Sequence, residues 1–298
     1  MFYKNIQIEM QTAELVLNKE GRIYHLNLQQ GDVAETIILV GDPGRAKWIS
    51  TFFDEIRFEG HNREIFTYTG TYNGKELSVI STGMGTDNIE IVLTELDALF
   101  NIDFKTKQQK KELTSLNFLR IGTSATLQAD ISVKDSFVVS KYGLGLDGLL
   151  YFYEKGPFVM EREMTSSFIN RMDWDRDLPK PYAVNASSEL IEKLGKGLKK
   201  GITLTAPGFY APQGREVRLK VMDDSIIDKA SQFNYGGFQV TNFEMETSAL
   251  YALSAMLGHR AMTVCDIIAN RITGDFNLDY KPSMEKLIKL MLERISQI

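Results

Sequence analysis

Short apolar runs alternate along this chain with segments of helical periodicity. Thr36–Val40 (TIILV) is apolar at nearly every position, and Leu77–Ser81 (LSVIS) is a second run of this kind. Such runs are typical of strands buried on both faces, which need helices on either side of the sheet. After the second run, apolar residues recur every three or four positions, at Ile89, Val92, Leu93, Leu96 and Phe100. The alternation therefore predicts an α/β protein with a largely parallel sheet.

The same alternation continues to the end of the chain. Further strands are expected at Asn117–Ile121, Asp135–Ser140, Ile202–Ala206, Phe238–Asn242 and residues 260–268. Helices are expected at about residues 45–53, 88–100 and 246–257 and after Pro282. We predict a single-domain three-layer α/β/α sandwich with a mixed, mostly parallel central sheet. The domain spans residues 1–298, with 1–20 as an N-terminal extension and 141–200 as surface elaboration or an interface.

Composition excludes several classes of protein. The formal net charge is −5 and no long Lys/Arg run occurs, which argues against a nucleic-acid partner. The single cysteine, Cys265, rules out an intramolecular disulfide and argues against a Cys-rich metal site. Residues 1–20 do not resemble a signal peptide, and no run of about 18 apolar residues occurs that would span a membrane. We therefore expect a cytoplasmic protein that does not bind membranes.

The first segment with chemical interest is GDPGR, Gly41–Arg45, between a predicted strand and a predicted helix. Glycine allows the backbone to approach a ligand closely, and free amides at a helix start attract anions. Arg45 would add a bidentate contact to phosphate oxygens. The alternative is an ordinary strand–turn–helix joint with a solvated Arg45.

The second segment is RIGTSA, Arg120–Ala125. Arg120 stands near the end of an apolar strand, where its charge needs an anion or a carboxylate as partner. Gly122 opens the backbone, and Thr123 and Ser124 supply amide and hydroxyl donors. The alternative is a structural salt bridge of Arg120 beside a tight turn.

Two later segments suit a sugar and a base. In NFEMET (242–247), Glu244 and Glu246 have carboxylates that accept hydrogen bonds from a diol, and Met245 suits an apolar sugar face. The alternative is that both acids complement a helix N-terminus. FYAPQGR (209–215) combines aromatic faces with the donors of Gln213 and Arg215, or is merely a Pro/Gly loop.

Together these segments resemble the nucleoside phosphorylase family, and within it the uridine-cleaving branch. The resemblance runs from YHLNL (24–28) to Asn270–Arg271. It implies that GDPGR and RIGTS are the two phosphate loops and that NREI sends an arginine into the adjacent subunit's site. The phosphate ligands that it implies are Gly41, Arg45, Arg63, Arg120, Gly122 and Thr123.

The resemblance also implies a nucleoside site. The spacing Phe-x-x-x-Gln-x-Arg, met at Phe209, Gln213 and Arg215, is that of the residues that stack on and hydrogen-bond uracil in the uridine branch. His25, beside Tyr24, is implied to reach the ribose 5′-hydroxyl bound to a neighbouring subunit. The remaining nucleoside-binding residues are Ser124, Glu244, Met245 and Glu246. For His25 and Arg63, a solvated surface position is the alternative.

The implied reaction is phosphorolysis of uridine, and of related pyrimidine nucleosides, to uracil and ribose 1-phosphate. The residues implied to act in it are Arg45, Arg120, Gln213, Arg215 and Glu246. Inorganic phosphate is the co-substrate, and neither a metal nor a cofactor is expected. The resemblance further implies a homodimer or a hexamer built from dimers, and leaves open a monovalent cation between subunits near Glu64.

Asp266 leaves a second substrate class open. It is taken to fall where purine-cleaving relatives carry an acid that protonates the leaving base, so a purine nucleoside phosphorylase is the alternative. Otherwise Asp266 ends a strand and pairs structurally, with Arg271 as the candidate partner. A non-catalytic nucleoside-binding protein on the same scaffold is the alternative from a different class.

Overall fold

A computed structural model describes residue 11 and residues 13–298 of the chain. The first ten positions of the predicted N-terminal extension, and position 12, lie outside these described residues. The division into an extension, a domain and an elaboration stays a prediction.

The strands fall in the order that the apolar runs predict, with additional strands between them. They are β1 (Thr36–Val40), β2 (Glu55–Asn62), β3 (Ile65–Tyr72), β4 (Lys75–Ser81), β5 (Ile102–Asp103), β6 (Gln108–Gln109), β7 (Asn117–Thr126), β8 (Phe137–Gly145), β9 (Tyr182–Asn185), β10 (Lys199–Thr205), β11 (Asn234–Tyr235), β12 (Phe238–Glu244) and β13 (Arg260–Asn270). Every strand that the sequence predicts is present, although several are longer than expected.

The helices occupy the segments with helical periodicity, and further helices lie in the region 141–200 and at residues 226–231. They are α1 (Pro43–Ser50), α2 (Thr86–Asn101), α3 (Gly156–Val159), α4 (Arg162–Met172), α5 (Ser188–Leu194), α6 (Ile226–Ser231), α7 (Thr247–Leu257) and α8 (Lys281–Ile295), with 3₁₀ turns η1 (Leu149–Phe152) and η2 (Ala211–Gln213). Among the described residues, none of these helices is long and apolar enough to cross a membrane.

One mixed sheet of eleven strands runs through the molecule. Its order is β11-β12-β10-β8-β13-β7-β1-β4-β3-β2, with β9 paired to β8. The pairings β4–β1–β7–β13 and β8–β10–β12 are parallel, whereas β13–β8 and the hairpin strands β2–β3–β4 are antiparallel. This confirms the predicted mixed sheet.

The central part of the sheet closes on itself, which the sequence did not predict. Strand β12 pairs in parallel with β10 and also antiparallel with the end of β7, at Asn242–Thr126 and Phe243–Ala125. The five strands β7, β13, β8, β10 and β12 therefore form a ring. The closure brings the RIGTSA segment of β7 beside the NFEMET segment at the end of β12.

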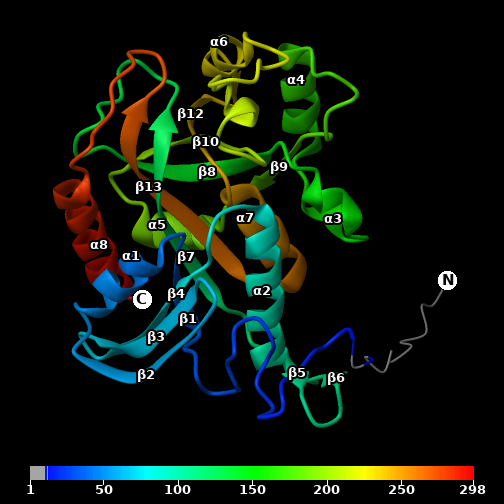
Figure 1. Cartoon of the computed structure of the whole chain (residues 1–298), viewed down its shortest axis with the longest axis vertical. Coiled ribbons are helices and arrows are strands. Elements are labelled where there is room, and N and C mark those ends of the chain that lie inside the picture. Colours follow the sequence, from blue (N-terminus) through cyan, green and yellow to red (C-terminus); the bar gives the residue numbers. More distant parts are fainter. Residues whose placement is uncertain (1–10, 12) are drawn as a thin grey trace.

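Helices cover both faces of the sheet (Figure 1). Strand β1 is buried at all its positions, as an apolar run flanked by helices must be. Helices α2 and α7 pack together on one side, and α5 and α8 pack together against β13 on the other. This arrangement confirms the predicted α/β architecture, and it leaves the strand ends open at the sheet edge where GDPGR and NFEMET lie.

Helix α2 begins earlier than its apolar periodicity indicates. The predicted start is at about residue 88, but the helix begins at Thr86 after Gly85. The Asn88 amide donates to the carbonyl oxygen of Thr82 (3.0 Å) and to a Glu64 carboxylate oxygen (3.3 Å). Asn88 therefore stabilises the loop that precedes the helix.

Candidate active site

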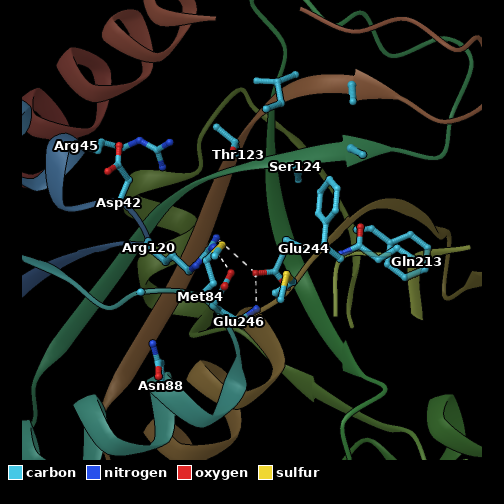
Figure 2. Close-up of a pocket in the computed structure, with 18 of the residues that line it drawn as sticks. Asp42, Arg45, Met84, Asn88, Arg120, Thr123, Ser124, Gln213, Glu244 and Glu246 are labelled. Atoms are coloured by element: carbon cyan, nitrogen blue, oxygen red, sulfur yellow. Dashed lines mark hydrogen bonds and ion pairs between the residues drawn. The ribbon is translucent and has the colours of Figure 1, made fainter. Parts of the chain in front are cut away.

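A cavity of about 670 Å³ opens where β1, β7 and β12 end (Figure 2). Its size lies in the range of small-ligand sites. The sequence-predicted residues that line it are Gly41, Arg45, Arg120, Thr123, Ser124, Phe209, Gln213, Arg215, Glu244, Met245 and Glu246. Of the predicted site residues, Gly122, His25 and Arg63 do not line it. Segments up to about 200 positions apart in the sequence thus meet in one cavity.

The GDPGR segment forms one end of the cavity. Asp42 caps helix α1, because its carboxylate accepts a hydrogen bond from the Gly44 amide (2.9 Å), and Pro43 opens the helix. Gly41 lies in close packing, since a Cβ there would lie 3.3 Å from the Gly83 carbonyl oxygen, a tight contact. Arg45 is 8% exposed and donates to the carbonyl oxygen of Ile121 (3.4 Å). A buried guanidinium therefore lies beside the start of α1.

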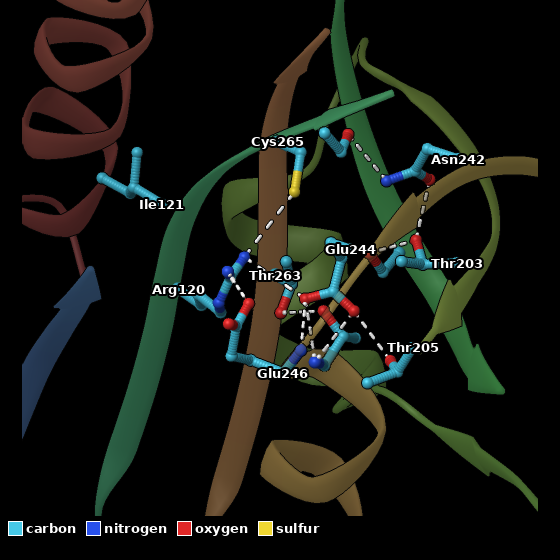
Figure 3. A network of polar contacts seen from close by, with 12 residues as sticks. Arg120, Ile121, Thr203, Thr205, Asn242, Glu244, Glu246, Thr263 and Cys265 are labelled. Atoms are coloured by element: carbon cyan, nitrogen blue, oxygen red, sulfur yellow. Dashed lines mark hydrogen bonds and ion pairs between the residues drawn. The ribbon is translucent and has the colours of Figure 1, made fainter. Parts of the chain in front are cut away.

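Arg120 is held by two carboxylates at the floor of the cavity (Figure 3). Its guanidinium donates to Glu246 in a close contact and lies 3.4 Å from a Glu244 oxygen. Burial lowers the pKa of Arg120, but the charges of Glu246 and Glu244 outweigh burial and raise it. The sequence predicted that this arginine needs an anion or a carboxylate as partner, and the carboxylates of Glu246 and Glu244 are these partners.

Gly122 makes room for the Arg120 side chain. A Cβ at Gly122 would lie 2.1 Å from an Arg120 Nη1 atom, so only glycine allows the guanidinium to lie against the strand. The same Nη1 atom lies 3.8 Å from the Cys265 sulfur on the neighbouring strand β13. Burial raises the pKa of the Cys265 thiol to about 12, so it stays neutral next to the cation. Gly122 acts on the cavity through Arg120 and does not line it.

Glu244 binds the first turn of helix α7. Its carboxylate accepts hydrogen bonds from the amides of Glu246 (2.9 Å) and Thr247 (2.9 and 3.1 Å) and from the Thr205 hydroxyl (2.7 Å). This is the helix N-terminal role that the sequence left open as an alternative. Glu244 lines the cavity, but its oxygens are already well supplied with donors.

Glu246 links Arg120 to the start of helix α2. One carboxylate oxygen contacts Arg120, and the other accepts a hydrogen bond from the Gly85 amide (2.8 Å). Burial raises the pKa of this carboxyl, and the Arg120 charge opposes the rise. Glu246 has fewer donors than Glu244, so it keeps more capacity to accept further hydrogen bonds.

Ser124, on β7, contacts the neighbouring strand β12. Its hydroxyl accepts a hydrogen bond from the Asn242 amide (2.9 Å), which fixes the side chain where it lines the cavity. Thr123 and Ser124 belong to the long strand β7, which continues to Thr126. The predicted strand end at Ile121 is therefore too early, and the tight turn of the alternative reading is absent here, because the pairing with β13 extends to Asn270 and keeps the segment in the sheet.

The FYAPQGR segment forms the other end of the cavity, across from Arg45 (Figure 2). Gln213 ends the turn η2 and is 2% exposed. The Arg215 guanidinium lies 3.9 Å from the centroid of the Phe209 ring and donates to the Gln213 side-chain oxygen (2.6 Å). Burial, and then the charge of Arg271, lower the pKa of Arg215 to about 10. The three residues of the motif form one contact group.

Arg271 supports this loop and was not predicted as a site residue. It donates to the carbonyl oxygens of Gln213 (2.7 Å) and Gly214 (3.2 Å). Its only signal in the sequence was its place in Asn270–Arg271, where the resemblance ends. Its contacts fix the backbone from which the Gln213 side chain enters the cavity.

Asp266 lies outside the cavity. It is a fully buried residue inside β13, where its carboxylate accepts a hydrogen bond from Ser283 on α8 (2.7 Å). Burial raises its pKa to about 6. The expected position at a strand end and the expected pairing with Arg271 are therefore wrong. Neighbouring strand positions face opposite sides, so Cys265 faces Arg120 and Asp266 faces α8.

The strand residues of β13 that do line the cavity are Ile268 and Ala269, and neither side chain titrates. The lining residues that the sequence did not assign to the site include Asp42, Met84, Asn88 and Phe276. Met84 and Phe276 are more than half exposed at the mouth of the cavity. No periodic pattern marked them, because both lie in loops.

His25 and Arg63 lie together on the surface. The Arg63 guanidinium is 5.9 Å from the centroid of the Tyr24 ring, and the Tyr24 and His25 rings are in edge contact at 4.9 Å. Arg63 has a positive φ of 52° in the turn between β2 and β3. Neither side chain lines the cavity of its own chain, so any contact with a bound nucleoside would have to be made in a neighbouring copy.

The described part of the chain contains no cluster of metal-ligating side chains. No group of three or more His, Cys, Asp or Glu residues lies there in an arrangement that could hold a metal ion. Glu64 lines the cavity and contacts Asn88. A monovalent cation near Glu64 stays an open prediction.

Comparisons with known proteins agree with this geometry. The profile of the phosphorylase superfamily matches residues 35–295. The chain is 32% identical over 270 residues to the uridine phosphorylase of Thermococcus kodakarensis, which covers 89% of this chain and 83% of the relative. It is also 28% identical over 282 residues to a DeoD-type purine nucleoside phosphorylase of Bacillus velezensis, covering 91% of this chain and 99% of the relative.

A solved structure gives the same result. A Trypanosoma brucei nucleoside phosphorylase, described as showing uridine phosphorylase activity, superposes with a TM-score of 0.81 at 30% identity. The match covers 95% of this chain and 100% of that one. The chain therefore belongs to the phosphorylase superfamily, and within it to the nucleoside phosphorylases, pentosyltransferases that use inorganic phosphate as co-substrate.

Proposed function

We propose that this enzyme cleaves uridine, and related pyrimidine nucleosides, with inorganic phosphate to give uracil and ribose 1-phosphate. The observation that carries the proposal is the contact group of Phe209, Gln213 and Arg215 at the opposite end of the cavity from Arg45. Uracil has two carbonyl oxygens that accept hydrogen bonds from such donors. The named uridine phosphorylases among the similar proteins support the same substrate.

Phosphate binds at the GDPGR end. The anion is held by the Arg45 guanidinium, by Thr123 on β7 and by the backbone beside Gly41. Arg120 lines the same cavity, and so do its carboxylate partners Glu244 and Glu246. Arg63 of a neighbouring copy completes the site. These donors orient a phosphate oxygen toward the sugar carbon that is attacked, so the reaction gains from proximity.

The ribose lies between the two ends, over Met245. Glu246 accepts hydrogen bonds from the ribose hydroxyls, because its carboxylate keeps free acceptor capacity in the contacts above. Glu244 acts mainly by fixing the start of α7 and hence the place of Glu246. His25 of a neighbouring copy reaches the 5′-hydroxyl.

The base leaves with a growing negative charge on its ring and carbonyl oxygens. Gln213 and Arg215 donate hydrogen bonds where that charge develops, and they stabilise the transition state more than the bound substrate. Phosphate carries the negative charge that balances the positive charge on the ribose. The scheme proceeds without a covalent enzyme intermediate.

A purine substrate is the second candidate, because a DeoD-type purine nucleoside phosphorylase is also similar. The acid that this alternative assigned, Asp266, is buried against Ser283 and does not line the cavity. The cavity-lining residues of β13 are Ile268 and Ala269, neither of which donates a proton. The geometry therefore favours the pyrimidine over the purine.

Assembly and location are part of the proposal. Because His25 and Arg63 lie outside the cavity of their own chain, the active unit is a homodimer, or a hexamer built from dimers. The enzyme acts in the cytoplasm on small molecules. Size-exclusion chromatography with light scattering tests the assembly, and a fully active monomer contradicts it.

The substrate is tested by an absorbance assay with uridine, thymidine and inosine, each with and without phosphate. We expect phosphate-dependent cleavage of uridine and little cleavage of inosine. Arg215→Ala is expected to remove most uridine phosphorolysis, by about 100-fold or more, while phosphate binding by calorimetry stays near that of the parent enzyme. Arg218→Ala, an exposed arginine of the same loop, is the matched control. Full activity of the Arg215 variant, or a preference for inosine, refutes the proposal.

A further inference from the structure

Glu95, in the middle of helix α2, binds the His25 segment through several hydrogen bonds. Its carboxylate accepts from the backbone amides of His25 (3.0 Å) and Leu26 (2.9 Å). It also lies 2.5 Å from Nδ1 of the His25 ring. The Glu95 side chain is 13% exposed and that of His25 is 32% exposed, so the contact is shielded while the ring still reaches the surface.

This contact selects one form of the imidazole. A carboxylate offers only acceptors, so Nδ1 of His25, the ring atom that it contacts, is the donor in this hydrogen bond. In the neutral ring, Nε2 then has a free lone pair. Nε2 lies across the ring from Nδ1 and has no hydrogen-bond partner among the described residues. The ring therefore presents an acceptor to the solvent side.

The neighbouring contacts fix the orientation of the same segment. The Asn62 amide, at the end of β2, donates to the carbonyl oxygens of His25 (2.9 Å) and Tyr24 (3.3 Å). Arg63 follows Asn62 directly and lies over the Tyr24 ring. Hydrogen bonds from α2 and β2 thus hold His25 close to Arg63 before any ligand arrives.

We propose that Glu95 is a positioning residue for the sugar: it holds His25 as the Nδ1-protonated tautomer, so that Nε2 accepts a hydrogen bond from the 5′-hydroxyl of a nucleoside bound to a neighbouring copy. The inference rests on the proposed function for the role of His25. It assigns the recognition of the 5′-hydroxyl to a Glu95–His25 pair rather than to the imidazole alone. Pre-setting the tautomer and the ring orientation lowers the cost of ordering the side chain on binding.

The first test reads the tautomer directly. The chain has three histidines, so a long-range ¹H–¹⁵N spectrum of ring-labelled protein at alkaline pH is simple to assign, with His25→Ala identifying the signal of interest. We expect the parent enzyme to show the Nδ1–H form for His25. Glu95→Gln, whose amide can donate as well as accept, should shift the equilibrium toward the Nε2–H form. An Nε2–H tautomer in the parent enzyme overturns the inference, whether or not the variant folds.

The second test reads the sugar contact. For Glu95→Gln we expect kcat/KM for uridine to fall about three- to tenfold, as for loss of one hydrogen bond, mainly through a higher KM. With 5′-deoxyuridine, which lacks the hydroxyl, the variant and the parent should be equal. Glu90→Gln removes the same charge from the same helix, at a residue whose carboxylate contacts Tyr153, and is the matched control.

His25→Ala tests the role of His25 in the proposed function separately from the role of Glu95. If it has no effect on uridine relative to 5′-deoxyuridine, the role of His25 in the proposed function is wrong. If it reduces that preference and Glu95→Gln leaves it unchanged, the inference about Glu95 is wrong and the proposed function stands. Equal losses with both substrates in Glu95→Gln would show a general structural role and would also overturn the inference.

Discussion

Replacing Arg120 by methionine tests how strongly the floor of the cavity depends on one cation. Met keeps an unbranched side chain of similar length and removes the charge. The side chains of Arg120, Glu244 and Glu246 are 6%, 2% and 4% exposed, so the pairs are shielded from water. Removing one partner of such a buried pair leaves an uncompensated charge and destabilises by about 3–5 kcal/mol.

The remaining contacts of the two carboxylates place the expected loss within this range. Without Arg120, Glu244 keeps the Thr205 hydroxyl and the amides of Glu246 and Thr247. Glu246 keeps only the Gly85 amide. One carboxylate rather than both is left short of donors, so we expect the free energy of unfolding to fall by about 3 kcal/mol, near the lower end. That is a large share of the ~5–15 kcal/mol that ordinarily separates folded from unfolded protein.

The loss should depend on pH. Burial raises the pKa of Glu246 above 4.5, and Arg120 opposes the rise. Removing Arg120 therefore raises this pKa further in the folded state but not in the unfolded chain. Between the ordinary and the raised pKa the folded variant binds more protons than the unfolded one, so its free energy of unfolding falls as the pH rises. The destabilisation relative to the parent enzyme should be smaller at pH 5 than at pH 8.

Urea unfolding followed by circular dichroism, at one protein concentration and at both pH values, measures this directly. Arg57→Met is the control, because Arg57 pairs with Glu76 in the open, with side chains 38% and 51% exposed. Exposed pairs contribute about 0–1 kcal/mol. A loss for Arg120→Met no larger than that of the control, or one that is greater at pH 5 than at pH 8, would refute the reasoning.

Two further variants separate the roles of the acids. Glu246→Gln removes a negative charge near the phosphate, so the KM for phosphate should fall. It also weakens the hydrogen bonds accepted from the ribose hydroxyls, so kcat/KM for uridine should drop about 10–100-fold in steady-state assays. A higher KM for phosphate contradicts this. Asp266→Asn should leave kcat/KM within about twofold, because Asp266 does not line the cavity. Burial raises the pKa of Asp266 to about 6, so ionising it lowers parent stability as the pH rises toward that value. The Asn variant should therefore gain on the order of 2 kcal/mol relative to the parent from pH 4 to pH 8 in urea unfolding, and no gain would contradict the buried position.

Strands with a continuous apolar run were predictable from the sequence. Thr36–Val40 coincides with β1, since burial on both faces leaves only apolar side chains there. The strands β2 and β3 were not predicted. β2 is an edge strand with largely exposed residues, and its charged composition resembles a loop. The pair Asn73–Gly74, which makes the tight turn between β3 and β4, was the available signal for the hairpin.

The candidate site was predictable as a set of segments but not as a set of contacts. GDPGR and NFEMET stand at strand ends, and strand ends meet in an open α/β sheet. Which side chains pair across the cavity depends on register and on the ring closure through β12. Arg120 and Glu246 are 126 positions apart, and no local pattern links them. Asp266 was misplaced for the same reason, because a shift of one position along a strand exchanges its two faces.

The carboxylates around Arg120 bear on how the cavity attracts an anion. With both acids ionised, Arg120, Glu244 and Glu246 together carry one negative charge, so this cluster alone does not draw phosphate. Arg45, at the GDPGR end, forms no salt bridge within the described residues and donates to the neutral carbonyl of Ile121, while the Asp266 charge acts on it without a direct contact. Under the proposed function, we therefore infer that the attraction for phosphate comes mainly from Arg45 and from Arg63 of a neighbouring copy. In the same proposal, Arg120 serves chiefly to hold Glu246 in place as the acceptor for the ribose hydroxyls. The proposed contribution of this buried arginine is the geometry that it imposes at the sugar rather than net stability, because replacing a whole buried ion pair by apolar groups often costs little stability.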